Sequence, residues 1–170
     1  MIKKISAEFL GTFFLLATVV GSGIMGENLA NGNTAIALLG NTIATGAILV
    51  VLILVFGPIS GAHFNPVVTL SFILRKEISI TQASIYIGIQ LIAALAGVLC
   101  AHFMFDLTPL QTSENIRSGG GQWLAEMVAT FGLVMTILGC RKYKPESVSF
   151  GVGLYITAGY WFTASTSFAN

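Results

Sequence analysis

Residues 57–69 read Gly-Pro-Ile-Ser-Gly-Ala-His-Phe-Asn-Pro-Val-Val-Thr, and this stretch interrupts an otherwise continuous apolar region. It combines a helix breaker with a fresh helix start at Asn65 and Pro66. Asn at a cap position accepts a hydrogen bond from a free backbone N–H, and Pro at the first helical position lacks a donor that would be unpaired anyway. Inside a bilayer, non-helical backbone persists only where protein buries it or where it lines a water-filled cavity. The stretch therefore predicts a loop that lines a pore.

The composition predicts an integral membrane protein. Of the 170 residues, 55% are hydrophobic and 9% are charged, and the mean hydropathy is +0.85. Soluble domains carry about 25% charged residues. We therefore expect one all-α transmembrane domain over residues 1–170 that contacts the lipid bilayer. Segments near the roughly 20 residues that cross a bilayer lie at 5–25, 35–56, 82–105, 122–140 and 148–165.

The basic residues indicate the orientation of these five expected spans. All eight Lys and Arg residues lie before or between the spans, and seven fall on one side of the topology. By the positive-inside rule that side is cytoplasmic, so we expect a multi-pass plasma or inner membrane protein with a cytoplasmic N-terminus. The seven are Lys3, Lys4, Arg75, Lys76, Arg141, Lys142 and Lys144, and the eighth is Arg117.

The chain lacks the residue patterns of an enzyme. No Ser-His-Asp set, phosphate loop or paired catalytic carboxylates occur in the sequence, and Cys100 and Cys140 lack the spacing of metal ligands. We expect no enzymatic activity, no cofactor or metal, and no nucleic-acid partner. A signal peptide is the alternative reading of the N-terminal run, because Lys3 and Lys4 precede it. The early Glu8 and the length of the run favour a span.

The sequence also contains an internal repeat. Residues 7–15, Ala-Glu-Phe-Leu-Gly-Thr-Phe-Phe-Leu, return at 125–133 as Ala-Glu-Met-Val-Ala-Thr-Phe-Gly-Leu. Three expected crossings separate the copies, so the second copy is inverted in the membrane. We expect repeat one at 1–105 and an incomplete repeat two at 122–170. A second half-helix and a sixth span are expected after Asn170 and are missing from the chain.

Residues 66–74 are expected to form a half-helix. Nine residues at about 1.5 Å each cover roughly 14 Å, which is about half of the hydrocarbon thickness. The segment ends at Arg75 and Lys76. Cations are favoured at a helix C-terminus and at the cytoplasmic interface, so the local and global signals agree.

Together these motifs resemble those of the major intrinsic proteins, the aquaporins and glycerol facilitators. The motifs are the paired Ala-Glu-x-x-x-Thr-Phe repeat, the Ser-Gly-Ala-His-x-Asn-Pro segment at 60–66, and the terminal Ser-x-x-Asn at 167–170. Val67 departs from the Ala that is usual in the family. The resemblance implies an inverted-repeat helical bundle and a passive channel for water and small uncharged solutes such as glycerol, urea or metalloid hydroxides. It also implies a pore in each subunit of a homotetramer.

The resemblance implies functional residues as well. Two cap asparagines would donate N–H bonds to passing water, three loop carbonyls would line the pore, and three small residues would form a wide, polar filter. An arginine of the filter would lie beyond this chain. These are, in order, Asn65 and Asn170 (Pro66 starting the first half-helix), then Gly61, Ala62 and His63, then Thr45, Ala158 and Ser167.

Glu8 and Glu126 are the acids inside the expected spans and occupy the same place in the repeat. Ionisable groups there are expensive and usually functional. We expect each carboxylate to accept N–H bonds from a re-entrant loop and hold its shape. The alternative is that the side chain reaches the interface, which suits Glu8, near the start of its helix, better than Glu126. His63 has two readings, a pH sensor or a neutral residue bonded within the loop.

Two other kinds of protein share parts of this pattern. Secondary transporters also use inverted repeats and broken helices, but they need an ion-coordinating site near the midplane. The other alternative is a truncated, non-conducting membrane protein of the same fold, because one wall of the pore would be missing.

Overall fold

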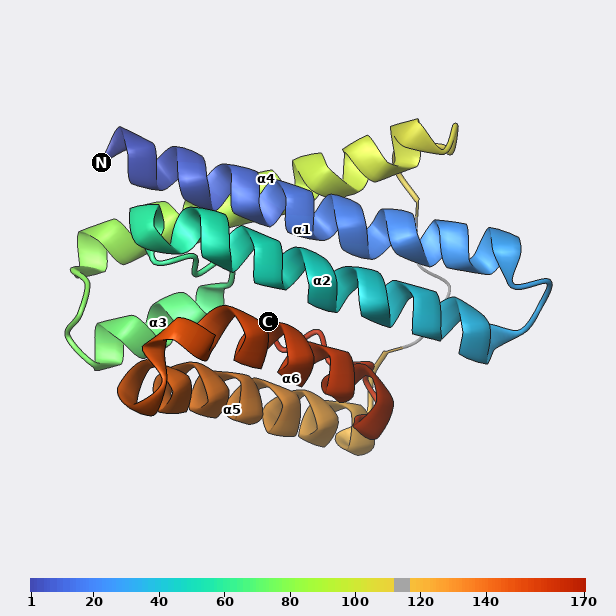
Figure 1. Cartoon of the computed structure of the whole chain (residues 1–170). Helices are drawn as coiled ribbons and strands as arrows, with labels where there is room; N and C mark the ends of the chain where they lie inside the picture. The colour runs from blue at the N-terminus through green and yellow to red at the C-terminus, as the bar shows by residue number, and fades with distance from the viewer. Residues whose placement is uncertain (112–116) are drawn as a thin grey trace.

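The structure, a computed structural model, describes residues 1–111 and 117–170. Within these ranges the secondary structure is helical and contains no strand (Figure 1). The helices are α1 (Ile2–Leu29), α2 (Thr34–Ser60), α3 (Pro66–Leu74), α4 (Ile80–Met104), α5 (Gly120–Tyr143) and α6 (Val148–Phe162), with a short 3-10 helix, η1 (Pro145–Ser147), before α6.

Four of the described helices, α1, α2, α4 and α5, are long and apolar enough to cross a membrane. Large apolar side chains such as Leu95 and Phe131 point outward from them, which suits a surface that faces lipid. The expected fifth span is shorter than predicted, because α6 has 15 residues and ends at Phe162 rather than at residue 165. Beyond Phe162 the backbone leaves the helix, and Phe168 and Ala169 hydrogen-bond to Glu126 on α5.

The second span is longer than predicted. We expected the helix to end at residue 56, before Gly57 and Pro58, but α2 continues through Pro58 to Ser60. Proline is tolerated inside membrane helices because neighbouring groups satisfy the backbone that it frees. The break comes at Gly61, whose φ of 93° is left-handed and ends the helix.

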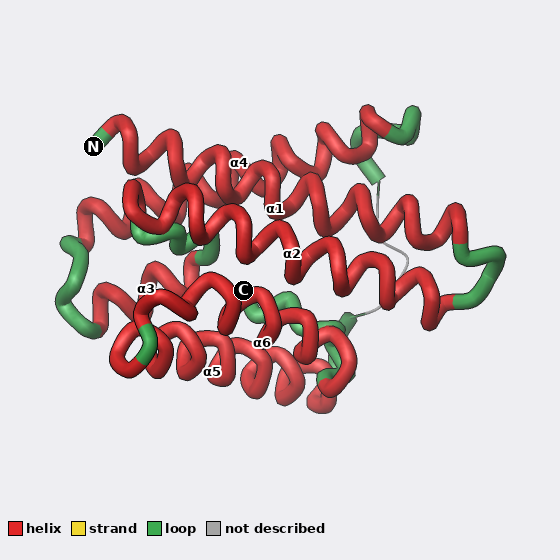
Figure 2. Tube along the Cα trace, in the orientation of Figure 1, coloured by secondary structure: helices red, strands yellow, loops and turns green. Residues whose placement is uncertain are grey.

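The half-helix lies where the sequence predicts it. α3 runs from Pro66 to Leu74, with Asn65 as its N-cap. Figure 2 shows the non-helical stretch before α3 inside the bundle, and the C-terminal segment returning toward the middle. The N-terminus, the α3–α4 turn and the α5–α6 turn share one end of the molecule (Figure 1). Arg75, Glu77 and Arg141 lie there in one ion-pair cluster, and we call this the charged end.

Glycines allow the helices to cross closely at two places. A Cβ on Gly97 of α4 would overlap the backbone oxygen of Phe13 on α1. A Cβ on Gly153 of α6 would lie 2.6 Å from the backbone oxygen of Gly46 on α2. Only a residue without a side chain fits such contacts. The second crossing is between α2 of repeat one and α6 of repeat two, so closely packed helices border the interior between the two repeats.

Candidate functional site

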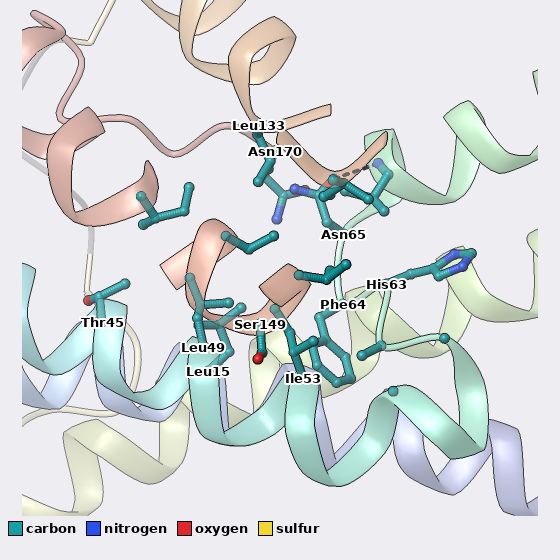
Figure 3. A pocket seen from close by; sticks show the side chains of 18 of the residues that line it. Leu15, Thr45, Leu49, Ile53, His63, Phe64, Asn65, Leu133, Ser149 and Asn170 are labelled. Carbon is teal, nitrogen blue, oxygen red and sulfur yellow. Dashed lines mark hydrogen bonds between the residues drawn. The ribbon is translucent and has the colours of Figure 1, made fainter. Parts of the chain in front are cut away.

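A cavity of about 750 Å³ lies between the two repeats. Four of the helices at its wall each contribute a stripe of mainly apolar residues spaced four apart, as on one helix face. Figure 3 shows Thr45 and His63 far apart on the lining, with Asn65 and Asn170 between them. The stripes comprise Leu15 and Val19 of α1, Thr45, Leu49 and Ile53 of α2, Leu133, Ile137 and Arg141 of α5, and Val152, Ile156 and Tyr160 of α6.

The two loops supply the polar part of the lining. Gly61, Ala62 and His63, the residues predicted to present carbonyls to the pore, all border the cavity. From the other repeat, Ser167 and Asn170 border it as well. The structure therefore brings residues of both loops to one cavity with otherwise mainly apolar walls.

The first loop is tied to the carboxylate of Glu8. Its Oε1 accepts hydrogen bonds from the backbone N–H of His63 at 2.9 Å and from the hydroxyl of Ser60 at 2.6 Å. Its Oε2 accepts from the backbone N–H of Phe64 at 2.8 Å and from Nε2 of Gln90 on α4 at 2.9 Å. Glu8 is completely buried. Four donors on one buried carboxylate form a charge-assisted network, the strong kind of hydrogen bond.

The second loop is tied to Glu126 in the same way. Its two carboxylate oxygens accept from the backbone N–H groups of Phe168, at 3.0 Å, and Ala169, at 2.8 Å. Phe168 and Ala169 stand two and one residues before Asn170, as His63 and Phe64 stand before Asn65. The inverted repeat therefore carries one device twice, an acid in a span that holds two successive loop N–H groups.

Asn65 connects the two loops. Its Oδ1 accepts from the backbone N–H groups of Val67, at 2.7 Å, and Val68, at 3.1 Å, which caps α3. Its Nδ2 donates to the backbone oxygen of Ala169 at 2.7 Å. An amide nitrogen carries two hydrogens, so this bond leaves one N–H of Asn65, a residue that borders the cavity.

The contacts of His63 favour the loop-bonded reading. Its Nδ1 lies 3.1 Å from the hydroxyl oxygen of Thr69 on α3. The ring packs against Phe72 with the ring centroids 4.3 Å apart, and against Tyr86 at 5.3 Å. The ring is thus fixed on three sides by aromatic and hydroxyl groups.

One of the three predicted filter positions lies away from the cavity. Thr45 and Ser167 border the cavity, but Ala158 lies on the exposed side of α6. The prediction placed this residue by its spacing from Asn170. Residues 163–170 are not helical, so this spacing does not determine which face of α6 a residue occupies. Tyr160 borders the cavity instead, and its hydroxyl lies 3.2 Å from that of Thr45. The stripe of Val152, Ile156 and Tyr160 is a four-residue spacing that would have revealed it.

The charged end of the cavity also went unpredicted. Arg141 borders the cavity, and its Nη2 lies 2.8 Å from Oε2 of Glu77. Glu77 also binds Nε of Arg75 through its Oε1 at 2.6 Å. These hydrogen bonds, first that of Arg141 and then that of Arg75, hold the pKa of the Glu77 carboxyl below its usual value. Within the described residues no three His, Cys, Asp or Glu side chains gather as a metal site would need.

Known proteins resemble this chain over nearly its whole length. A family model described as "Major intrinsic protein" matches residues 1–167. An "Aquaglyceroporin AqpS" of Rhizobium meliloti (strain 1021) is 55% identical over 168 residues, which are 99% of this chain and 72% of that protein. A "Probable aquaporin NIP4-2" of Arabidopsis thaliana is 35% identical over 173 residues, covering 99% of this chain and 60% of the relative.

A more distant relative also matches most of the chain. An "Aquaporin-5" of Homo sapiens is 29% identical over 171 residues, covering 94% of this chain and 62% of the relative. The chain thus spans less than two thirds of the length of the plant and human relatives. The match to the family model, the paired acids and the two loops at one cavity agree with one another. The chain belongs to the major intrinsic protein family.

Proposed function

We propose that this protein forms a passive channel for water and small uncharged solutes, with the pore inside each subunit. The observation that carries the proposal is the cavity of about 750 Å³ that both loops and helices of both repeats border. Apolar walls offer a passing molecule few hydrogen bonds, so the loops are the places where water or a solute exchanges its partners. The proposed domain is single, with repeat one at 1–105 and repeat two at 122–170.

The electrostatics of the first loop support selection against cations. α3 begins at Pro66, beside the cavity, and a helix N-terminus carries partial positive charge. Asn65 presents an N–H at the same place, because its Oδ1 is engaged in the cap. A donor beside a positive dipole end favours the oxygen of water and disfavours a cation. We propose the same donor role for Asn170, which borders the cavity in Figure 3.

The proposed solutes are water, glycerol, urea and metalloid hydroxides. Thr45 and Ser167 are small residues at the lining, and the nearby Tyr160 adds a hydroxyl. Such a surface offers both donors and acceptors to a hydroxylated molecule. The name of the bacterial relative, an aquaglyceroporin, supports solute as well as water passage.

The contacts of the two acids argue against a secondary transporter. Such a protein needs an ion-coordinating group near the midplane. Glu8 and Glu126 instead accept hydrogen bonds from loop N–H groups. We propose that both acids maintain the shape of the loops and do not move with a substrate.

We also propose the setting in which the channel works. The N-terminus and the basic residues of the charged end would face the cytoplasm across a plasma or inner membrane, by the positive-inside rule. The subunits would assemble as homotetramers in the lipid bilayer. Exposed large apolar residues such as Leu95 and Phe131 are available for lipid or subunit contacts.

Stopped-flow light scattering on proteoliposomes tests the channel function. The purified chain is exposed first to an impermeant osmolyte and then to glycerol, alongside Thr45→Phe and Ala158→Phe. Thr45 borders the cavity, whereas Ala158 lies on the exposed side of α6. We expect fast, low-activation-energy shrinkage for the unaltered chain. Thr45→Phe should reduce glycerol flux most, and Ala158→Phe should leave both fluxes unchanged.

Two outcomes would contradict the proposal. Lipid-like rates for the unaltered chain would mean that the chain as given does not conduct. Equal effects of both phenylalanine substitutions would mean that the cavity is not the path.

A further inference from the structure

Arg141 makes two side-chain contacts at the charged end of the cavity. Its Nη2 is 2.8 Å from Oε2 of Glu77, and its guanidinium carbon lies 4.6 Å from the centre of the Phe72 ring. Phe72 in turn packs on His63. The carboxylate contacts one edge of the guanidinium and the Phe72 ring contacts one face. These contacts already restrict its conformations, so binding a ligand would cost less conformational entropy.

The rest of the Arg141 guanidinium is available to the cavity. A guanidinium carries five N–H donors, and the ion pair with Glu77 uses one nitrogen. Arg141 borders the cavity, whereas Arg75, the other partner of Glu77, does not. Two cations therefore share one carboxylate, and only Arg141 faces the path of a solute.

Two acceptor groups lie at the same end. Glu146, an exposed residue of η1, and Ser149, in the first turn of α6, also border the cavity. Within the described residues, the acid in both ion pairs of the charged end is Glu77. The Glu146 carboxylate takes part in neither of these two ion pairs. The Ser149 hydroxyl is 3% exposed and has no hydrogen-bond partner in the described structure. A buried hydroxyl without a partner gains free energy when a ligand supplies one.

We propose that Arg141, Glu146 and Ser149 form a recognition site for small, neutral, hydroxylated molecules at the charged end of the cavity. This inference rests on the proposed channel function. The guanidinium donates to hydroxyl oxygens of the solute, while Glu146 and Ser149 accept from its hydroxyl hydrogens. Phe72 and Pro145 at the same end offer apolar surface to the carbon chain of the solute. The site is separate from the Thr45–Tyr160 pair, because Ser149 and Tyr160 are eleven residues apart on α6, or roughly 16 Å.

The first test compares Arg141→Gln with Arg75→Gln in proteoliposomes. Both substitutions remove one cation from Glu77, but only Arg141 borders the cavity. We expect Arg141→Gln to lower glycerol flux about fivefold to tenfold with little change in water flux, because a charged hydrogen bond to the solute is lost. Arg75→Gln should change neither flux. Equal effects of the two variants would overturn the proposal, because Arg141 would then act through the ion-pair cluster.

The second test does not depend on conduction. A cysteine at position 149 (S149C) is introduced into the chain with Cys100 and Cys140 replaced by Ser, and its reaction with methyl methanethiosulfonate is timed in detergent. Glycerol should slow the reaction by about twofold at half occupancy, whereas sucrose at equal viscosity should not. A158C, on the exposed side of α6, is the control and should show no protection.

The outcomes separate the inference from the proposed function. If the unaltered chain conducts nothing but glycerol protects S149C and not A158C, the recognition site stands and the channel function fails. If the chain conducts but glycerol leaves the S149C rate unchanged, or the thiol does not react, the recognition site is wrong. Loss of protection on adding Arg141→Gln would show that the guanidinium takes part.

Discussion

The two re-entrant loops are built on the same plan but are held with different strength. In repeat one, Glu8 is completely buried and accepts hydrogen bonds from two backbone N–H groups, a serine hydroxyl and the Gln90 amide. In repeat two, Glu126 is half-buried and accepts from two backbone N–H groups of described residues. The backbone contacts are shared by the repeats, whereas the side-chain contacts occur in the first.

The difference shows which loop contacts the two repeats have in common. An acid in a span and hydrogen bonds to two loop N–H groups are common to both halves. The surrounding shell, Ser60 and Gln90, adds rigidity to the first loop. Tyr86 strengthens that shell, since its hydroxyl donates to the backbone oxygen of Ser60 at 2.9 Å. We therefore expect repeat one to be the more stable half.

Glu8→Gln should have the largest effect on stability. It removes the charge and turns one acceptor into a donor that faces other donors, in a site with no access to water. We expect a loss of about 3 kcal/mol or more in the free energy of unfolding. Thermal unfolding in detergent measures it. The control is Glu27→Gln, the same change on an exposed residue of α1, and equal effects of the two variants would refute the role of Glu8.

Gln90→Met should come second. The Gln90 amide donates to Glu8 and, at 3.1 Å, to the hydroxyl of Thr69 on α3. Its loss leaves Glu8 with three donors, so we expect about 2 kcal/mol of destabilisation. Leu91→Met, at a neighbouring position that is 57% exposed, is the control. In the double variant with Glu8→Gln the two losses should be less than additive, and full additivity would mean that the two residues do not act on one network.

Much of the fold follows from the sequence. The half-helix agrees with the prediction in both bounds, because Asn65, Pro66 and the following cations are local signals. Two of the differences in helix length, those of α2 and α6, have tertiary causes. α2 runs through Pro58 because the bundle tolerates the missing N–H, and α6 ends early because the segment after it is tied to Glu126. Neither cause is visible in a local pattern.

The candidate site was less predictable than the fold. The repeat pointed to Glu8 and Glu126, whose bracing role remains a prediction for the substitutions proposed here. Gln90 could not be found, because it lies 82 residues from Glu8 and no motif connects them. The sequence analysis used Arg141 only as one of the basic residues that indicate the membrane orientation. Its place at the cavity depends on how α5 packs beside α3, which no local pattern shows.

Glu126→Gln should have a smaller effect than either change in repeat one. Its carboxylate is half-buried and takes two hydrogen bonds, so water can replace part of what is lost. We expect about 1 kcal/mol of destabilisation. Limited proteolysis of residues 163–170 is the more sensitive readout, since local opening of the loop precedes global unfolding. A loss as large as that of Glu8→Gln would remove the distinction between the two loops.

The smallest expected effect is a pH dependence at the charged end, where Glu77 joins α3 of repeat one to α5 of repeat two. The hydrogen bonds from Arg141 and Arg75 lower the pKa of Glu77 from its ordinary value of 4.5. Because the folded-state pKa is lowered, the contribution of the Glu77 ion pairs to the free energy of unfolding is complete above about pH 4.5. It is lost as the pH falls through the lower, folded-state pKa. The unaltered chain should therefore have a slightly higher melting temperature than Glu77→Gln at pH 7, and the difference should close as the pH falls below 4.5. A difference in melting temperature that stays constant with pH would show that the charge of the Glu77 carboxylate does not stabilise the contact between α3 and α5. A difference that grows on acidification would contradict the lowered pKa. The effect is small because the pair is largely solvated, and exposed ion pairs contribute little.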